Sequence, residues 1–341
     1  MPLTRRTLLA ATSAALIAPR AAHAATVTDD AGRAVPVPAK VARVYPAGEP
    51  AAILLTMLAP DLLLGWPRAN TPQACAYMLT DICTRPRIAG ITGRGDTAST
   101  QSIVALKPDL ILDVGSTGPR YAALADRVQR ETGIPYAVLD GGIMGLSTSY
   151  EKLGRLIGRE AAGADFGDYC NMTLGVITNR IAFVPPEKRP RVYSERGPKG
   201  LTTELGGSSH GELIELMARN VAGELKGELG EVTIEQIRAW DPDVIVTINA
   251  TFASSVRGDP AWTSIKAVRE GRVHFMAGIP FGWFDAPPSG NRLIGLWWLG
   301  KILYPDLFKE DLRELTRDFY EKFYHAKLTE LQIDDVLARK S

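Results

Sequence analysis

The 341-residue chain has little cysteine, little histidine and almost no net charge. It holds 3 cysteines and 4 histidines, and its 39 basic residues face 38 acidic ones, a formal net charge of +1. This balance argues against a nucleic-acid partner, which needs a basic face. A zinc or manganese receptor normally brings several histidines together with a carboxylate, and so few histidines do not favour one. We expect no cofactor and no directly bound divalent metal.

The sequence also lacks an apolar run long enough to cross a membrane. Its N-terminus has the paired Arg5 and Arg6, an apolar stretch over residues 8–18, and an A-x-A pattern at residues 22–24. About eleven apolar residues are too few for a bilayer core, which needs roughly 20. This pattern predicts that residues 1–24 are a twin-arginine export signal and that the mature protein is periplasmic.

The three cysteines fall into two groups. Cys75 and Cys83 are close enough in sequence to close a small disulfide loop in an oxidising compartment, but both could equally be free thiols. Cys170 shares a helical pattern with Leu174 and Ile177, which predicts a core position.

One phrase occurs twice. Residues 100–113 read TQSIVALKPDLILD and residues 233–246 read TIEQIRAWDPDVIV. Each is a short amphipathic helix, a Pro-Asp pair and an unbroken apolar run, which is typical of a strand buried on both faces. The repeat predicts two α/β lobes of similar build, and a cleft between lobes is a preferred ligand site.

A helical segment separates the two repeats. Thr148 and Glu151 have the spacing of a capping box, and residues 149–183 carry helical periodicity without a strand signal. We expect Gly163 to divide this stretch, and a second helix over about 161–183 would be roughly 33 Å long. The predicted organisation is an N-terminal lobe over 25–147, a linking helical segment over 148–184 and a C-terminal lobe over 185–341.

Several phrases resemble one family. They are TDDAGRAVPVP, SIVALKPDLIL, GLTTELGGSSHGELIELMARNVA, TIEQIRAWDPDVIV, DPAWTSIKAVREGRVHFM and APPSGNRLIGLWWLGKILYPDLF, in this order along the mature chain. The sequence is similar to class III periplasmic substrate-binding proteins, which serve ABC importers for ferric siderophores, haem and cobalamin. The resemblance implies two Rossmann-like lobes joined by a long helix, a ligand held between them, delivery to an inner-membrane permease, and no catalysis. We expect a monomer.

The resemblance also implies two docking contacts with the permease. Members of the family usually dock through one acidic residue on each lobe. The matching position in the C-terminal lobe is Glu212, whereas the matching position in the N-terminal lobe is Gln101, which departs from the pattern. The first contact is therefore in doubt or moves to another acid such as Glu49 or Asp96.

Ligands of open α/β sheets lie beyond the carboxyl ends of the strands, so the loops there supply the candidate ligand-binding residues. Arginines beside aromatic rings suit an anionic, partly aromatic guest such as an iron chelate. The candidates are Trp66, Arg87, Arg94, Arg196, Ser208, His210, Phe252, Trp283 and Phe284. Arg196 and Trp283 are the preferred single positions.

Ferric siderophore is the expected cargo, and other interpretations stay open. Main-chain N–H groups of residues 206–209 suit molybdate or tungstate, with cobalamin or haem as further choices. Residues 207–211 also match the G-x-S-x-G elbow of serine hydrolases, which would make Ser209 a nucleophile with Asp243 or Asp285 and a later histidine. The preceding residues 201–205 are a poor buried strand, which argues against that elbow.

Overall fold

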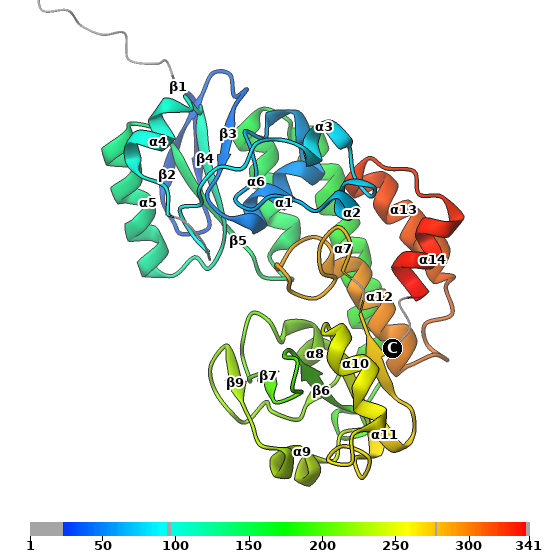
Figure 1. Cartoon of the computed structure of the whole chain (residues 1–341). Coiled ribbons are helices and arrows are strands. Elements are labelled where there is room, and N and C mark those ends of the chain that lie inside the picture. The colour runs from blue at the N-terminus through cyan, green and yellow to red at the C-terminus, as the bar shows by residue number, and fades with distance from the viewer. Residues whose placement is uncertain (1–22, 94–96, 277, 339–341) are drawn as a thin grey trace, which may run out of the picture.

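The computed structural model describes residues 23–93, 97–276 and 278–338. Figure 1 shows two α/β lobes with the long helix α7 running between them. The strands are β1 (His23–Thr28), β2 (Ala34–Pro38), β3 (Val44–Pro46), β4 (Leu110–Gly115), β5 (Tyr136–Asp140), β6 (Arg191–Glu195), β7 (Thr202–Glu204), β8 (Arg219–Asn220), β9 (Leu229–Glu231), β10 (Val244–Thr247) and β11 (Val273–Phe275). The predicted two-lobed α/β class is confirmed.

Fourteen α-helices and three short 3-10 helices connect these strands within the described ranges. The α-helices are α1 (Glu49–Leu58), α2 (Pro72–Cys75), α3 (Thr80–Cys83), α4 (Thr100–Ala105), α5 (Pro119–Thr132), α6 (Leu146–Ile157), α7 (Glu160–Ala182), α8 (Glu212–Met217), α9 (Ile234–Trp240), α10 (Ala250–Ser255), α11 (Lys266–Arg269), α12 (Arg292–Leu303), α13 (Leu312–Tyr324) and α14 (Glu330–Ala338). The 3-10 helices are η1 (Pro60–Leu62), η2 (Pro186–Lys188) and η3 (Val256–Gly258).

Each lobe is built on its own sheet. The N-terminal sheet is parallel, with the order β3-β4-β5, and the hairpin β1-β2 lies beside it. The C-terminal sheet runs β11-β10-β6-β7-β9, with β8 also paired to β6. Strands β7 and β9 are antiparallel to their neighbours because the chain reverses directly after β6. The carboxyl ends of β3, β6 and β10 lead into Glu49, Arg196 and Ile248, which line a cavity between the lobes.

The two copies of the repeated phrase fold alike. Lys107 and Asp241, which precede the prolines, both adopt left-handed backbone conformations, with φ of 49° and 40°. Each following aspartate fixes the start of the neighbouring strand: Asp109 accepts from the Arg43 amide at 2.9 Å, and Asp243 accepts from the Arg191 amide at 2.8 Å. The two copies thus share a Pro-Asp turn that ends a helix and aligns two parallel strands.

The linking segment divides at a different glycine from the one expected. Helix α6 ends at Gly158, which takes a left-handed φ of 69°, and α7 then continues without interruption through Gly163. Gly163 instead lies where α7 crosses α6: an added Cβ there would lie 2.9 Å from the Cα of Gly154. Sequence alone could not separate a glycine that ends a helix from one that permits close helix packing.

The C-terminal helices pack against the N-terminal lobe, beside α1, α2 and α3 in Figure 1. The Tyr77 hydroxyl donates to Asp335 at 2.6 Å, and the Gln332 amide donates to the Ala76 carbonyl at 2.7 Å. The chain therefore returns to its first lobe after completing the second. None of the helices in the described residues is both long and apolar enough to span a membrane.

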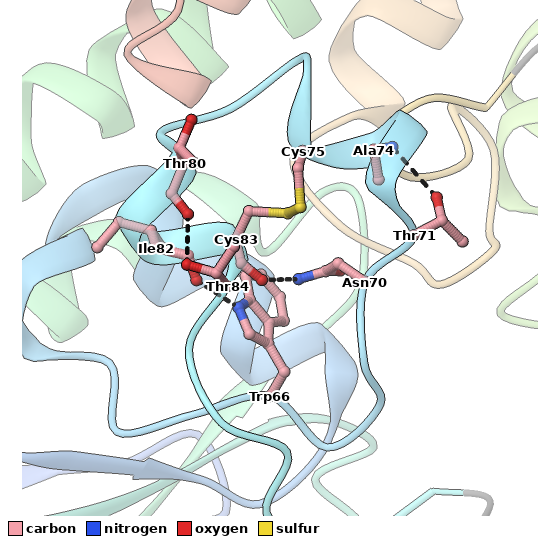
Figure 2. The surroundings of a disulfide bond; sticks show 9 residues. All are labelled: Trp66, Asn70, Thr71, Ala74, Cys75, Thr80, Ile82, Cys83 and Thr84. Carbon is pink, nitrogen blue, oxygen red and sulfur yellow. Dashed lines mark hydrogen bonds between the residues drawn. A yellow bond between two sulfur atoms is a disulfide. The ribbon is translucent and has the colours of Figure 1, made fainter.

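The structure settles the cysteine pairing that the sequence left open. Cys75 and Cys83 form a disulfide between α2 and α3, and Cys170 is a buried free thiol in the core, as expected. Figure 2 shows the loop around this bond, including Trp66, whose indole N–H donates to the Ile82 carbonyl at 2.8 Å.

Replacing both Cys75 and Cys83 with serine should lower the free energy of unfolding. A loop closed over a sequence separation of 8 restrains the unfolded chain, and its loss corresponds to about 2–3 kcal/mol. Urea denaturation followed by circular dichroism measures the change. A reducing agent should destabilise the wild type by a similar amount and leave the double variant unchanged. Equal stability of wild type and variant would contradict a restraining role.

Candidate ligand-binding site

A cavity of about 1010 Å³ lies between the two lobes. Its volume is at the upper end of the range for small-molecule pockets, about 300–1,000 Å³. The lining residues are Glu49, Pro50, Pro67, Arg68, Ala69, Asn70, Thr71, Ala74, Arg87, Thr92 and Gly93 from the first lobe, and Arg196, Thr202, His210, Leu229, Ile248, Pro280, Phe281, Asp285, Ala286, Pro287 and Pro288 from the rest of the chain. Arg196 and Ile248 directly follow β6 and β10, which is where an α/β sheet presents a ligand.

The wall formed by the N-terminal lobe carries two arginines and one acid. Arg68 and Arg87 are both exposed residues, and the Arg68 guanidinium lies 3.3 Å from the carboxylate of Glu49. Arginine side chains at a cavity wall are suited to binding an anionic group of a ligand. Glu49, which the sequence suggested as an alternative docking acid, thus lies in the cavity.

The disulfide loop forms the rim of the same wall. Asn70, Thr71 and Ala74 line the cavity, and Cys75 follows them directly. The Asn70 amide donates to the Cys83 carbonyl at 3.2 Å, and the Thr71 hydroxyl accepts from the Ala74 amide at 3.1 Å (Figure 2). The covalent bond therefore holds the segment that bears these polar groups. Sequence reasoning missed Asn70 and Thr71, although the closely spaced cysteines were a signal for an ordered loop.

The opposite wall contains a compact group of charged residues. The Arg196 guanidinium bonds to Asp285 through Nη2 and lies 3.3 Å from Glu204 through Nη1. The Nδ1 atom of His210 bonds to the same Oδ2 atom of Asp285. The side chains of Glu204 and Asp285 are fully buried, and that of Arg196 is 7% exposed. This wall therefore holds its positive charges in contact with carboxylates.

Burial changes the acidity of these carboxyl groups. It raises the pKa of Glu195, next to Arg196, from 4.5 to about 7, and it raises the pKa of Glu204 more than the opposing charge of Arg196 lowers it. Burial also acts to raise the pKa of Asp285, but hydrogen bonds and charge from His210 and Arg196 outweigh it and hold that pKa below its ordinary value. Asp285 is thus the anionic member of the group at neutral pH.

The structure brings Arg87, Arg196 and His210 together on one cavity and places other sequence candidates elsewhere. Trp66, Phe252, Trp283 and Phe284 are buried in the hydrophobic cores and are not among the lining residues. Ser208 is also buried, and its hydroxyl accepts from the Gly211 amide at 3.0 Å. Arg94 lies outside the described residues, as do residues 1–22 of the expected signal and Asp96.

Trp66 lies one layer behind the cavity. Its ring centroid is 5.6 Å from that of Phe281, which lines the cavity. Among the described residues, Phe281 is therefore the phenyl or indole side chain that lines this cavity. An aromatic residue after a strand suits either a core or a cavity, and the sequence contains no signal that separates these two positions.

On the wall formed by the C-terminal lobe, sequence reasoning also missed the part played by Glu204 and Asp285. Asp285 was placed only in a candidate catalytic triad, and Glu204 only in the weak strand before the serine. The Ser209 hydroxyl donates to Glu228 at 3.1 Å, while His210 is bonded to Asp285. The contacts of the described residues therefore do not place a histidine against Ser209, as a serine nucleophile requires.

The expected docking residues differ in their surroundings. Gln101 is exposed on α4. The Glu212 carboxylate, on α8, accepts from the Arg292 guanidinium at 2.6 Å and from the Ile143 amide at 2.9 Å, and Arg292 also donates to the Gly141 carbonyl. These contacts join the C-terminal lobe to the loop after β5 in the N-terminal lobe. We call Glu212, Arg292, Gly141 and Ile143 the lobe clasp.

The fold and the cavity define a two-lobed protein that binds a small molecule between its lobes. The profile of the "Periplasmic binding protein" family matches residues 84–278, which is more than half of the chain. The chain belongs to this family, and the class III resemblance is confirmed. It is the periplasmic substrate-binding component of an ABC transporter, which carries a small ligand to a membrane permease.

Individual relatives agree with this assignment. An ABC transporter substrate-binding lipoprotein of Bacillus subtilis, itself uncharacterised, is 26% identical over 224 residues, covering 62% of this chain and 67% of the relative. The structure of an ABC transporter solute-binding protein from Sulfurospirillum deleyianum is 25% identical, with a TM-score of 0.81, covering 92% of this chain and 99% of that one. The molybdate periplasmic binding protein MolA of Haemophilus influenzae, solved with molybdate bound, is 20% identical, with a TM-score of 0.73, covering 89% of this chain and 99% of that one.

Substituting glutamine for Glu195 should flatten the dependence of stability on pH. The folded-state pKa of about 7 lies above the ordinary 4.5, so the folded protein holds this proton more tightly than the unfolded chain does. The contribution is fully present below about pH 4.5 and is lost as pH rises through 7, at most about 3 kcal/mol for the whole shift. Urea unfolding at pH 5, 6, 7 and 8 measures it. A variant with the same decline as the wild type would contradict the raised pKa.

Substituting glutamine for Glu212 should destabilise the protein by about 2 kcal/mol, because Arg292 is almost fully buried and would lose its charge partner. The loss is smaller than for a fully buried pair because the Glu212 side chain is 32% exposed. Chemical denaturation is the measurement. Glu215→Gln on the same helix is the matched control and should change stability by less than about 0.5 kcal/mol, since Glu215 is exposed. Equal effects of the two substitutions would disprove the clasp.

Proposed function

We propose that this protein captures a ferric siderophore or a related iron chelate between its lobes and delivers it to an inner-membrane ABC permease. The observation that carries the proposal is the size of the cavity, about 1010 Å³, together with its arginine-bearing wall. A cavity this large suits a chelate rather than a bare ion. Arg68, Arg87 and the ring of Phe281 supply the contacts that an anionic, partly aromatic chelate needs.

Molybdate or tungstate is the second candidate. It is supported by the fold shared with the molybdate-binding protein of Haemophilus influenzae. The described residues contain no group of three or more histidine, cysteine or acidic side chains arranged to hold a metal ion. We therefore propose an iron chelate or an oxyanion as the cargo, rather than a bare divalent cation.

We also propose that the protein is exported through the twin-arginine route. We propose further that it docks on its permease through Glu212 and through the position of Gln101. Docking through Glu212 carries a structural condition. Its carboxylate is already bonded within the lobe clasp, so an arginine of the permease would have to compete with Arg292. Permease binding would then act directly on the contact between the lobes, which offers a route from docking to ligand release.

Tryptophan fluorescence tests the choice of ligand. Purified protein is titrated in parallel with a ferric catecholate, a ferric hydroxamate and molybdate, and a tryptophan-matched control protein corrects for light absorbed by the iron complexes. We expect saturable one-to-one quenching by a ferric chelate, because Trp66 lies against Phe281 at the cavity. A response to molybdate alone would move the assignment to an oxyanion, and no response to either chelate would contradict the proposal.

Two arginines provide a matched pair of variants for the same titration. Arg87→Ala should weaken binding of the chelate by about tenfold, the value of one charge-assisted hydrogen bond. Arg85→Ala should leave affinity unchanged, because the Arg85 guanidinium donates to the Asp61 carbonyl and is not among the lining residues. Equal weakening by both substitutions would indicate a non-specific effect of charge.

A further inference from the structure

One stretch of the cavity wall is bonded to both lobes. It consists of residues 279–291, which precede α12 and which we call the strap. In Figure 1 this orange loop lies between the two lobes. The strap contains neither a helix nor a strand, so its position depends on the side chains that bond to it. Six of its residues line the cavity: Pro280, Phe281, Asp285, Ala286, Pro287 and Pro288.

Two tyrosines of α13 hold the two ends of the strap. The Tyr320 hydroxyl donates to the Ile279 carbonyl at one end. At the other end, the Tyr324 hydroxyl donates to the side-chain oxygen of Asn291 at 2.7 Å. The Asn291 amide in turn donates to the Phe281 carbonyl at 3.4 Å, which links the two ends. We call Tyr320, Tyr324 and Asn291 the anchor. All three are fully buried, so breaking one of these bonds would leave a buried polar group without its partner.

The anchor joins the strap to the N-terminal lobe. Helix α13 packs against α1 of that lobe, and the ring of Tyr320 lies beside that of Tyr77, with 6.3 Å between their centroids. The ring of Phe281 contacts Trp66 and Tyr324, with centroid distances of 5.6 and 6.4 Å. The aromatic ring at the cavity is therefore held by the N-terminal lobe and by α13, which packs on that lobe.

The middle of the strap is bonded to the C-terminal lobe instead. The Asp285 carboxylate bonds to Arg196, which follows β6, and to His210, which precedes α8. Directly after the strap, Arg292 bonds to Glu212 within the lobe clasp. A change in the arrangement of the lobes must therefore move the strap or break one of these sets of contacts.

A loop that is held at both ends presents one cavity surface rather than many. If the strap sampled other positions, the fraction of molecules with a formed wall would fall, and the apparent affinity for a ligand would fall by the same factor. Ordering the loop on binding would also reduce the free energy of binding. The anchor can therefore influence affinity although its three residues are not among those that line the cavity.

We propose that Tyr320, Tyr324 and Asn291 are positioning residues for ligand binding. They fix the strap so that Phe281 and the neighbouring prolines meet the ligand in one preformed arrangement. The inference rests on the proposed function, because a ligand of the cavity is needed to detect the effect on affinity. A bond that only stabilised the fold would change the free energy of unfolding and leave the affinity of the folded protein unchanged.

Matched tyrosine-to-phenylalanine variants of the purified protein test the anchor. Tyr324→Phe removes the hydroxyl that bonds to Asn291 and keeps the ring beside Phe281. Tyr304→Phe is the control, because the Tyr304 hydroxyl donates to the Met217 carbonyl at 2.6 Å, outside the strap. Isothermal titration calorimetry with a ferric catecholate should show binding weakened by about three- to tenfold in Tyr324→Phe, the value of one hydrogen bond. The control should bind as the wild type does.

Hydrogen exchange measures the strap without a ligand. Inside the strap, the Gly282 amide donates to the Ala286 carbonyl at 3.0 Å. Mass spectrometry of the ligand-free protein should show faster exchange over residues 279–291 in Tyr324→Phe than in the wild type, because a looser strap opens more often. Tyr304→Phe should exchange over these residues at the wild-type rate.

The outcomes separate the anchor from the proposed function. Equal affinities of Tyr324→Phe and Tyr304→Phe for the ferric catecholate overturn the positioning role, and so does unchanged exchange over the strap in Tyr324→Phe. If the wild type binds neither a ferric catecholate nor a ferric hydroxamate, iron-chelate capture is overturned, and the exchange measurement still decides whether the anchor fixes the strap. Circular dichroism checks folding, and Tyr320→Phe, from which the same results are expected, replaces Tyr324→Phe if that variant does not fold.

Discussion

The contact between Arg292 and Glu212 is the interaction on which the site depends, because the cavity has walls from both lobes. Arg292 is buried at the start of α12, where Glu212 of one lobe and the Gly141 carbonyl of the other both bond to its guanidinium. An unpaired guanidinium at this depth would carry a large desolvation cost, so the pair favours one arrangement of the lobes. The uninterrupted helix α7 supports the same arrangement over a longer distance.

The two cavity walls differ in whether their charged side chains are exposed to solvent or buried. The arginines of the N-terminal wall are exposed and therefore retain contact with solvent until a ligand replaces it. The charges of the C-terminal wall are already desolvated, and Arg196, Asp285 and His210 are bonded to one another. The anionic cargo proposed above would therefore meet arginine side chains mainly on the first wall. The disulfide beside Asn70 and Thr71 limits how far the first wall can adapt.

Sequence patterns predicted the fold better than the site, for a physical reason. The Pro-Asp turns at residues 107–109 and 241–243 act locally, so their role in ending a helix and starting a strand could be inferred from neighbouring residues. Arg196 and His210 could be placed because polar side chains after a strand have few alternatives to a cleft. Trp283 was placed in the cleft by the same rule, yet it is a core residue, since an apolar ring at a strand end can be buried in either direction.

Sequence patterns could not predict that Asp285 belongs to the cavity wall, because the residues that bond to it are far away in the chain. Arg196 is 89 residues before it and His210 is 75 residues before it, and neither spacing forms a motif. The group these residues form, together with Glu204, is electrostatically costly, and hydrophobic side chains of similar volume would stabilise the lobe at least as well. Keeping three ionisable groups at the wall of a cavity therefore makes more sense as recognition of a polar ligand than as a contribution to folding.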